Sequence, residues 1–182
     1  MKNSLAAAVL LLAVPAFAAA PRVAVVIDDF GLTYPKDQPD ADWMALKFPM
    51  TFAVMPVSPR PAKAAEEVKA SGHELIIHYP FDKYQKLELP ADRVAPADLK
   101  SVTALLEKAF KQIPGAVGLN NQQSYRGTMN RPMRAAFMKL LKPKGVYFLD
   151  SHVSGKSVAY DEASKAGMPR TVNGIFLDCP HE

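Results

Sequence analysis

The chain has 182 residues, of which 49% are hydrophobic and 22% charged, and its formal net charge is +4. This length is enough for one domain with a buried core, and the composition is ordinary for a globular protein. The lysine and arginine residues are scattered, which argues against a nucleic-acid groove or a polybasic membrane patch. Cys179 is the one cysteine, so the chain has no internal disulfide framework.

Residues 1–20 are typical of a secretory signal peptide. Lys2 precedes an apolar stretch over residues 5–17, and three alanines follow at residues 18–20. The apolar stretch is shorter than a transmembrane helix needs. We therefore expect a mature domain over residues 21–182, a periplasmic or secreted location, and no stable membrane anchor after signal cleavage. The alternative is an uncleaved N-terminal anchor.

Beyond the leader, apolar runs alternate with segments of helical periodicity. Six β-branched, apolar runs predict strands buried on both faces, as in parallel sheets. These strands cover residues 22–29, 50–56, 74–79, 116–121, 145–151 and 174–179. The intervening helices, bounded by proline and glycine, cover residues 59–71, 95–112, 131–141 and 157–166. The alternation predicts an α/β domain with right-handed crossovers and a parallel sheet or barrel.

Polar side chains follow the predicted strands where each strand ends. They are Asp28, Asp29, His78, Asn120, Asn121, Asp150, Ser151, His152 and Asp178. Because the carboxyl ends of parallel strands meet at one edge, we expect a functional site there. The adjacent pair Asp28 and Asp29 suits a metal ligand beside a proton acceptor, since a nearby cation keeps both carboxylates ionised. Asp150 and Asp178 have an alternative interpretation as helix N-caps or Asx-turns.

Six segments together resemble the divergent polysaccharide deacetylases, relatives of the NodB-type carbohydrate esterases. They read VVIDDFG (25–31), TFAVMP (51–56), GHELIIHYPF (72–81), PGAVGLNN (114–121), YFLDS (147–151) and IFLDC (175–179). The resemblance implies a deformed (β/α)7-type barrel with parallel strands. This sequence ends after the sixth predicted strand, so we expect the last helix and strand to be missing. Either the chain is a piece of a longer reading frame, or a protein partner covers the open sheet edge.

The resemblance also implies a role for each site residue. Asp28 resembles the general base, Asp29 and His78 resemble metal ligands, and Asp82 stands where the broader family has a second histidine. A divalent ion, zinc or a similar metal, held by these ligands would activate water to attack an acetyl carbonyl. Substrate contacts are expected from Asn121, Asp150, His152 and Asp178.

Two departures from the family pattern count against this chemistry. The divergent branch reads Asn-Asn-His-Met-Gly-Ser after the fourth strand, and this chain has Gln122 in place of the histidine; a neutral amide is a weak zinc ligand. The Gly-His-Pro segment, whose histidine resembles the general acid, is absent from this sequence.

Our leading hypothesis is a metal-dependent carbohydrate deacetylase-like hydrolase that acts on N- or O-acetyl groups of envelope or secreted polysaccharide. The alternative is a catalytically inactive glycan-binding or protein-interaction module on the same fold.

Overall fold

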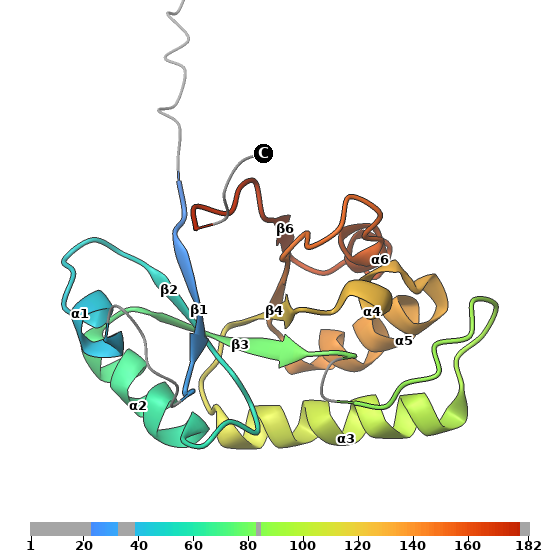
Figure 1. Cartoon of the computed structure of the whole chain (residues 1–182), viewed down its shortest axis with the longest axis horizontal. Coiled ribbons are helices and arrows are strands. Elements are labelled where there is room, and N and C mark those ends of the chain that lie inside the picture. Colours follow the sequence, from blue (N-terminus) through green and yellow to red (C-terminus); the bar gives the residue numbers. More distant parts are fainter. Residues whose placement is uncertain (1–22, 33–38, 83–84, 179–182) are drawn as a thin grey trace, which may run out of the picture.

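The computed structural model describes residues 23–32, 39–82 and 85–178. The predicted signal peptide and Cys179 lie outside these ranges. The described residues form a six-stranded sheet whose neighbouring strands are all parallel and follow one another in chain order (Figure 1). The strands are β1 (Val26–Phe30), β2 (Thr51–Val54), β3 (Glu74–Pro80), β4 (Gly118–Gln122), β5 (Tyr147–Asp150) and β6 (Arg170–Val172).

Helices connect the strands, and several of them begin at residues that sequence rules favour. They are α1 (Asp40–Met44), α2 (Pro61–Ser71), α3 (Pro96–Gln112), α4 (Tyr125–Met129), α5 (Arg131–Leu141), the 3-10 turn η1 (Lys142–Lys144) and α6 (Ala159–Lys165). Proline occupies the first turn of α2, α3 and α5, where its missing N–H costs nothing. The Asn130 side chain caps α5 by accepting a hydrogen bond from the Met133 N–H at 2.9 Å.

The two faces of the sheet have different surroundings. Strands that follow in order, joined by right-handed crossovers, place their helices on the same face. On that helix-covered face Phe52, Tyr79 and Phe148 belong to the large core, which includes Phe137 of α5. The opposite, inner face carries a small apolar cluster of Ala53, Ile76 and Leu149. This arrangement confirms the predicted α/β class and is consistent with an open, deformed barrel.

The predicted sixth strand is wrong. The strand that pairs with β5 is β6, with Phe148 opposite Arg170, whereas residues 173–178 form no strand. Ile175 and Leu177 in the predicted run are 58% and 79% exposed. An apolar run in a sequence indicates only that the segment favours burial. The strand beside β5 is instead formed by residues 170–172, because these residues make the main-chain hydrogen bonds with β5. The short helices α1 and α4 were not predicted either.

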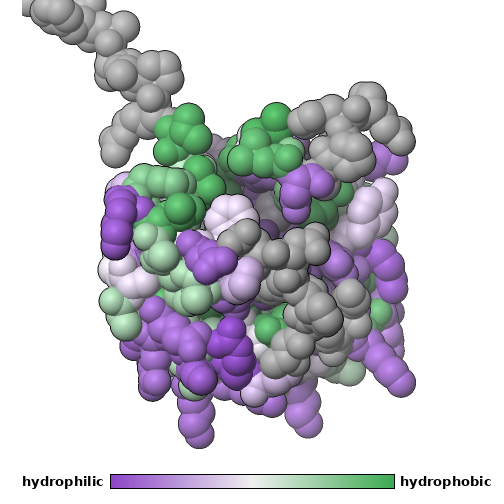
Figure 2. Space-filling view, turned by 60° about the vertical axis from the view of Figure 1, so that its left-hand side comes forward, coloured by the Kyte–Doolittle hydropathy of each residue, from purple (hydrophilic) through white to green (hydrophobic). Residues whose placement is uncertain are grey.

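The sheet has β1 and β6 as its two edge strands, and the residues of β6 are exposed. Hydrophobic residues gather in the upper part of the face seen in Figure 2, and strongly hydrophilic ones in the lower part. That a protein partner covers the sheet edge after the last strand remains a prediction. None of the helices within the described ranges is both long and apolar enough to cross a membrane.

Candidate functional site

A bulge near the end of β1 turns two successive carboxylates to the same side. In a regular strand, neighbouring side chains point to opposite faces. The pairing of β1 with β2 shifts register between Ile27 and Phe30, and Asp29 takes a left-handed conformation with φ of 65°. Both Asp28 and Asp29 therefore reach His78 on the inner face, while Phe30 returns to the core.

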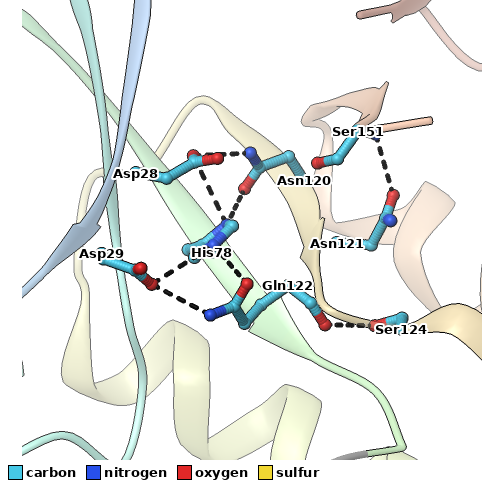
Figure 3. Close-up of polar contacts among 8 residues, drawn as sticks. All are labelled: Asp28, Asp29, His78, Asn120, Asn121, Gln122, Ser124 and Ser151. Atoms are coloured by element: carbon cyan, nitrogen blue, oxygen red, sulfur yellow. Dashed lines mark hydrogen bonds and ion pairs between the residues drawn. The ribbon is translucent and has the colours of Figure 1, made fainter. Parts of the chain in front are cut away.

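His78 lies at the centre of this group (Figure 3). Its side chain is 3% exposed, whereas those of Asp28 and Asp29 are each 34% exposed. The Nδ1 atom of His78 is 3.5 Å from Oδ1 of Asp28, and its Nε2 atom is 3.5 Å from Oδ1 of Asp29. Each ring nitrogen thus faces one of the two carboxylates, and the carboxylates form the solvent-accessible side of the group.

Two amides of β4 connect the histidine to the carboxylates. The Oδ1 atom of Asn120 is 2.7 Å from His78 Nδ1, and its Nδ2 atom donates to Asp28 Oδ1 at 2.9 Å. Gln122 repeats the pattern on the other side, with Oε1 3.0 Å from His78 Nε2 and Nε2 donating to Asp29 Oδ1 at 3.0 Å. We call Asp28, Asp29, His78, Asn120 and Gln122 the inner-face cluster.

Three members of the inner-face cluster bring possible metal-ligand atoms close together. Nε2 of His78 lies 3.0 Å from Oε1 of Gln122 and 3.5 Å from Oδ1 of Asp29, whereas Gln122 contacts Asp29 through its Nε2 atom, which is a donor and not a ligand. Neighbouring ligand atoms around a zinc-sized ion are about 3.0–3.4 Å apart for bonds of about 2.1 Å. The carboxylate and the imidazole are ordinary ligands, whereas the amide of Gln122 is a weak one. The residues present thus fit a divalent ion of reduced affinity.

The structure does not assemble the ligand set predicted from the sequence. No group of three or more His, Cys, Asp or Glu side chains that could hold a metal occurs in the described part of the chain, so Asp29 and His78 are not joined by Asp82. Instead, Oδ2 of Asp82 accepts a hydrogen bond from the Arg126 N–H at 3.0 Å, and its buried Oδ1 has no hydrogen-bond partner.

Two predicted substrate contacts, Asn121 and Asp150, are each only 1% exposed. Asn121 pairs with Tyr79, whereas Asn120 pairs with His78, so Asn121 points away from the inner-face cluster (Figure 3). Its Oδ1 atom accepts from the Ser151 N–H at 3.1 Å. Asp150 accepts from the His152 N–H, the Ser157 hydroxyl and the Tyr160 N–H. These bonds fit the alternative interpretation of Asp150 as a turn and cap residue.

The two other predicted contacts and His73 occupy different positions. His152 is exposed and follows β5 with a φ of 53°. Asp178 is exposed and lies six residues beyond the end of β6, outside any strand. His73, which we expected to be structural, has Nε2 3.1 Å from the Met44 carbonyl oxygen and packs its ring edge-on against Phe52.

Behind the strand ends, on the helix-covered face, lies a fully buried arginine. The Arg134 guanidinium is 4.1 Å from the ring centroid of Phe81, and its Nε donates to the Gly127 carbonyl at 2.9 Å. Burial lowers the pKa of Arg134 to about 10, and the carboxylates of Asp150 and Asp82 oppose that shift. Both terminal nitrogens lack a hydrogen-bond partner. The charge is therefore compensated by a ring face and by nearby carboxylates.

Comparison with known proteins places the chain in a family. The family model described as divergent polysaccharide deacetylase matches residues 25–182. The chain belongs to the divergent polysaccharide deacetylase family. Among its relatives is the uncharacterized protein YibQ of Escherichia coli (strain K12), 31% identical over 97% of this chain and 54% of YibQ. An uncharacterized Haemophilus influenzae protein is 27% identical over 88% of this chain and 57% of its own length.

The chain thus spans about half the length of the curated relatives that it matches. A solved structure, that of the uncharacterized protein ATU2773 from Agrobacterium tumefaciens C58, superposes with a TM-score of 0.65 at 19% identity. The superposition covers 85% of this chain and 63% of that protein. This likeness concerns the fold alone.

Two members of the inner-face cluster had no role in the sequence-based prediction, although Asn120 was named among the strand-end residues. Asn120 and Gln122 bracket Asn121, which was predicted instead. The period-two alternation of a strand could have identified them, because His78 opposes Asn120 and the next residue on the same face is Gln122. Gln122 had been considered only as a poor replacement for a histidine.

Proposed function

We propose that this chain is a metal-dependent carbohydrate deacetylase-like hydrolase, exported to the periplasm or secreted, that acts on acetylated polysaccharide. The observation that carries the proposal is the convergence of Asp28, Asp29, His78 and Gln122 at the carboxyl ends of β1, β3 and β4. Family membership supports the class of reaction, because it concerns polysaccharide deacetylases.

Asp29, His78 and Gln122 are the residues that would hold the metal. The chemistry that a bound divalent ion supplies is Lewis-acid polarisation of the acetyl carbonyl. Asp29 and Gln122 are hydrogen-bonded to each other, and His78 is buried between the strands, so the three side chains are already in place. Pre-positioned ligands need little reorganisation when an ion binds.

Asp28 is the proposed general base. It is partly exposed, and the Asn120 amide holds its Oδ1 atom at 2.9 Å, so a water molecule can approach the rest of the carboxylate. In the proposed reaction Asp28 accepts a proton as water adds to the acetyl carbonyl carbon. Asp28 then returns this proton to the sugar nitrogen or oxygen as the bond from that carbon breaks, which gives acetate and a free amino or hydroxyl group.

Acetate release from acetylated oligosaccharides tests the proposal. Removing a general base lowers the rate by roughly 10²–10⁴-fold, so Asp28→Asn is expected to lose at least a hundredfold in kcat/KM. Asp92→Asn is the matched control, because Asp92 is an exposed carboxylate that pairs with Arg93 on the surface. Acetate release that is equal in wild type and Asp28→Asn contradicts the proposal.

Gln122 favours a second candidate function. Its amide is hydrogen-bonded on both sides, which satisfies the cluster without a metal. A protein that binds glycan through Asp28 and Asp29 without cleaving it would have this arrangement. Binding of acetylated oligosaccharide without acetate release, under metal saturation, identifies this second function.

A further inference from the structure

A groove borders the carboxyl ends of β2 and β3. It has a volume of about 430 Å³, which lies in the range of small-ligand sites. Its lining comes from the loop after β2, the loop after β3 and one side of α3. The lining residues are Val57, Gln85, Ser101, Ala104, Leu105 and Lys108. The four α3 residues recur at intervals of three, one and three, so they form one stripe along the helix.

The side of the groove formed by the β2 loop is held in an unfavourable conformation. Val57 is β-branched and has a φ of 55°, a combination that strains the backbone. Its N–H donates to the Gln112 side chain of α3 at 3.0 Å, which ties the loop to the helix. The Val57 side chain is nevertheless 39% exposed. The strained residue thus presents an apolar side chain to solvent at the groove.

The groove is joined to the strand that carries His78. The Gln85 side chain donates to the carbonyl oxygens of Pro80 at 3.1 Å and Phe81 at 2.8 Å, directly at the end of β3. Ser101 of α3 in turn donates to Gln85 at 3.0 Å. Figure 1 shows the loop between β2 and α2 running down to the C-terminal end of α3. The groove therefore lies beside the carboxyl end of β3, the strand that carries His78.

A larger hollow of about 620 Å³ lies on the other side of the same loop, but its charged residues already pair with one another. Arg60 donates to Asp40 at 2.7 Å and to Glu67 at 2.6 Å. In the smaller groove, by contrast, Ala104 and Lys108 are exposed. Apolar carbon beside hydroxyl and ammonium groups suits a sugar ring, which has an apolar C–H face and a polar edge.

We infer that this groove is a binding subsite for the neighbouring sugar unit of an oligosaccharide chain. The inference rests on the proposed function and deepens it, because it names residues that bind the polysaccharide beyond the sugar unit that is hydrolysed. The sugar ring packs against Val57, Ala104 and Leu105. Lys108 donates hydrogen bonds to the sugar hydroxyl groups, and the Ser101 oxygen, whose own O–H is donated to Gln85, accepts one. Gln112 acts as a positioning residue that holds Val57 in place.

The test measures binding of N-acetylglucosamine oligomers, from the monosaccharide upward, by isothermal titration calorimetry, with acetate release recorded in parallel. Ala104→Arg fills the groove at an exposed position with a good helix former, so the fold is retained. We expect wild-type affinity to rise with chain length and Ala104→Arg to lose about tenfold for the longer oligomers. Monosaccharide binding is expected to stay unchanged.

Lys108→Ala and Lys111→Ala form a matched pair on α3, because both lysines are exposed and only Lys108 lines the groove. Lys108→Ala is expected to weaken oligomer binding and Lys111→Ala is not. If these variants abolish length-dependent binding and no protein releases acetate, the result supports the subsite and contradicts the hydrolase proposal. If the protein releases acetate but binds oligomers of all lengths with equal affinity, and the variants do not change that affinity, only the subsite is overturned. No binding of any oligomer overturns both.

Discussion

The two ends of the sheet differ in how they use left-handed backbone conformations. At the amino ends, the positive φ values that precede β3, β4, β5 and β6 belong to glycines: Gly72, Gly115, Gly145 and Gly167. On the carboxyl side of the strands, residues with side chains adopt this conformation. Asp29, Val57, Gln123 and His152 lie within three residues of a strand end, and Leu89 lies in the loop nine residues beyond β3. Glycine takes a positive φ without steric cost, whereas other residues store strain.

We interpret this difference as a division between relaxed turns at one end of the sheet and strained turns at the end that carries the candidate site. The amino-end turns are relaxed. The carboxyl-end turns hold strained backbone next to the inner-face cluster and the groove, and Gly31 after β1 is the exception among them. Strain concentrated at one end is typical of functional sites. The following predictions test this contrast, in order of decreasing expected effect.

The largest effect is expected at Arg134, which lies behind the carboxyl ends. Arg134→Met removes a fully buried charge, its hydrogen bond to the Gly127 carbonyl and the charge that faces the nearby carboxylates of Asp150 and Asp82. Breaking a buried charge interaction from one side costs about 3–5 kcal/mol. Urea unfolding should show this loss, while Lys139→Ala at an exposed position of α5 should change little. A stability equal to wild type would mean that the arginine is not electrostatically coupled to the strand ends.

A gain of metal affinity is expected from Gln122→His. The Gln122 side chain contacts both Asp29 and His78, so an imidazole at this position would replace a weak ligand by a strong one. We expect zinc to bind about tenfold to a hundredfold more tightly, which corresponds to about 1.4–2.7 kcal/mol. Competition with a chromophoric chelator measures the change. Asn121→His on the opposite face is the control and should leave zinc affinity unchanged.

A pair of substitutions compares the two ends directly. Gly145→Ala at the amino end should destabilise the protein by about 1–2 kcal/mol, because alanine disfavours a φ of 72° although an added Cβ has no atom within 4 Å. Gln123→Gly at the carboxyl end should instead stabilise it, by at most about 1 kcal/mol, because it relieves a φ of 37°. Denaturant midpoints measure both. Destabilisation by Gln123→Gly would remove the contrast between the two ends.

The smallest expected effect is a pH dependence of stability that arises from Glu162, a residue of α6. Burial raises the pKa of Glu162, but hydrogen bonds from Lys165 and Arg131 outweigh burial and hold the pKa below its ordinary value. Since the folded pKa is the lower one, the stabilisation is present above the unfolded pKa and is lost as pH falls through the folded pKa. Glu162→Gln should therefore be less stable at neutral pH, and the gap should close on acidification. Exposed Glu66→Gln should show no such gap.

Much of the fold follows from the sequence, because strand and helix periodicities are local properties. Five of the six strands and the four longer helices lie where apolar periodicity, proline and glycine predict them. The sixth strand failed because the run at Ile175 and Leu177 is apolar but exposed, and apolarity alone does not decide which residues pair with β5.

The site was predictable only in part. Asp28, Asp29 and His78 were identified because polar residues at strand ends stand out against apolar runs. That both carboxylates reach the same histidine depends on a bulge with Asp29 at a φ of 65°, which no sequence periodicity specifies. Likewise Asp82 and Asn121 are adjacent to the site in sequence but point elsewhere, because the face that a side chain occupies depends on strand register.

Metal binding by the purified chain tests the central claim most directly. Wild type, Asp29→Ala and His78→Ala would each be equilibrated with zinc, cobalt, nickel or manganese and their bound metal measured, with circular dichroism to verify folding. Our account predicts one equivalent of metal bound to wild type and its loss in both variants. A well-folded wild type that binds none of these metals would contradict the account.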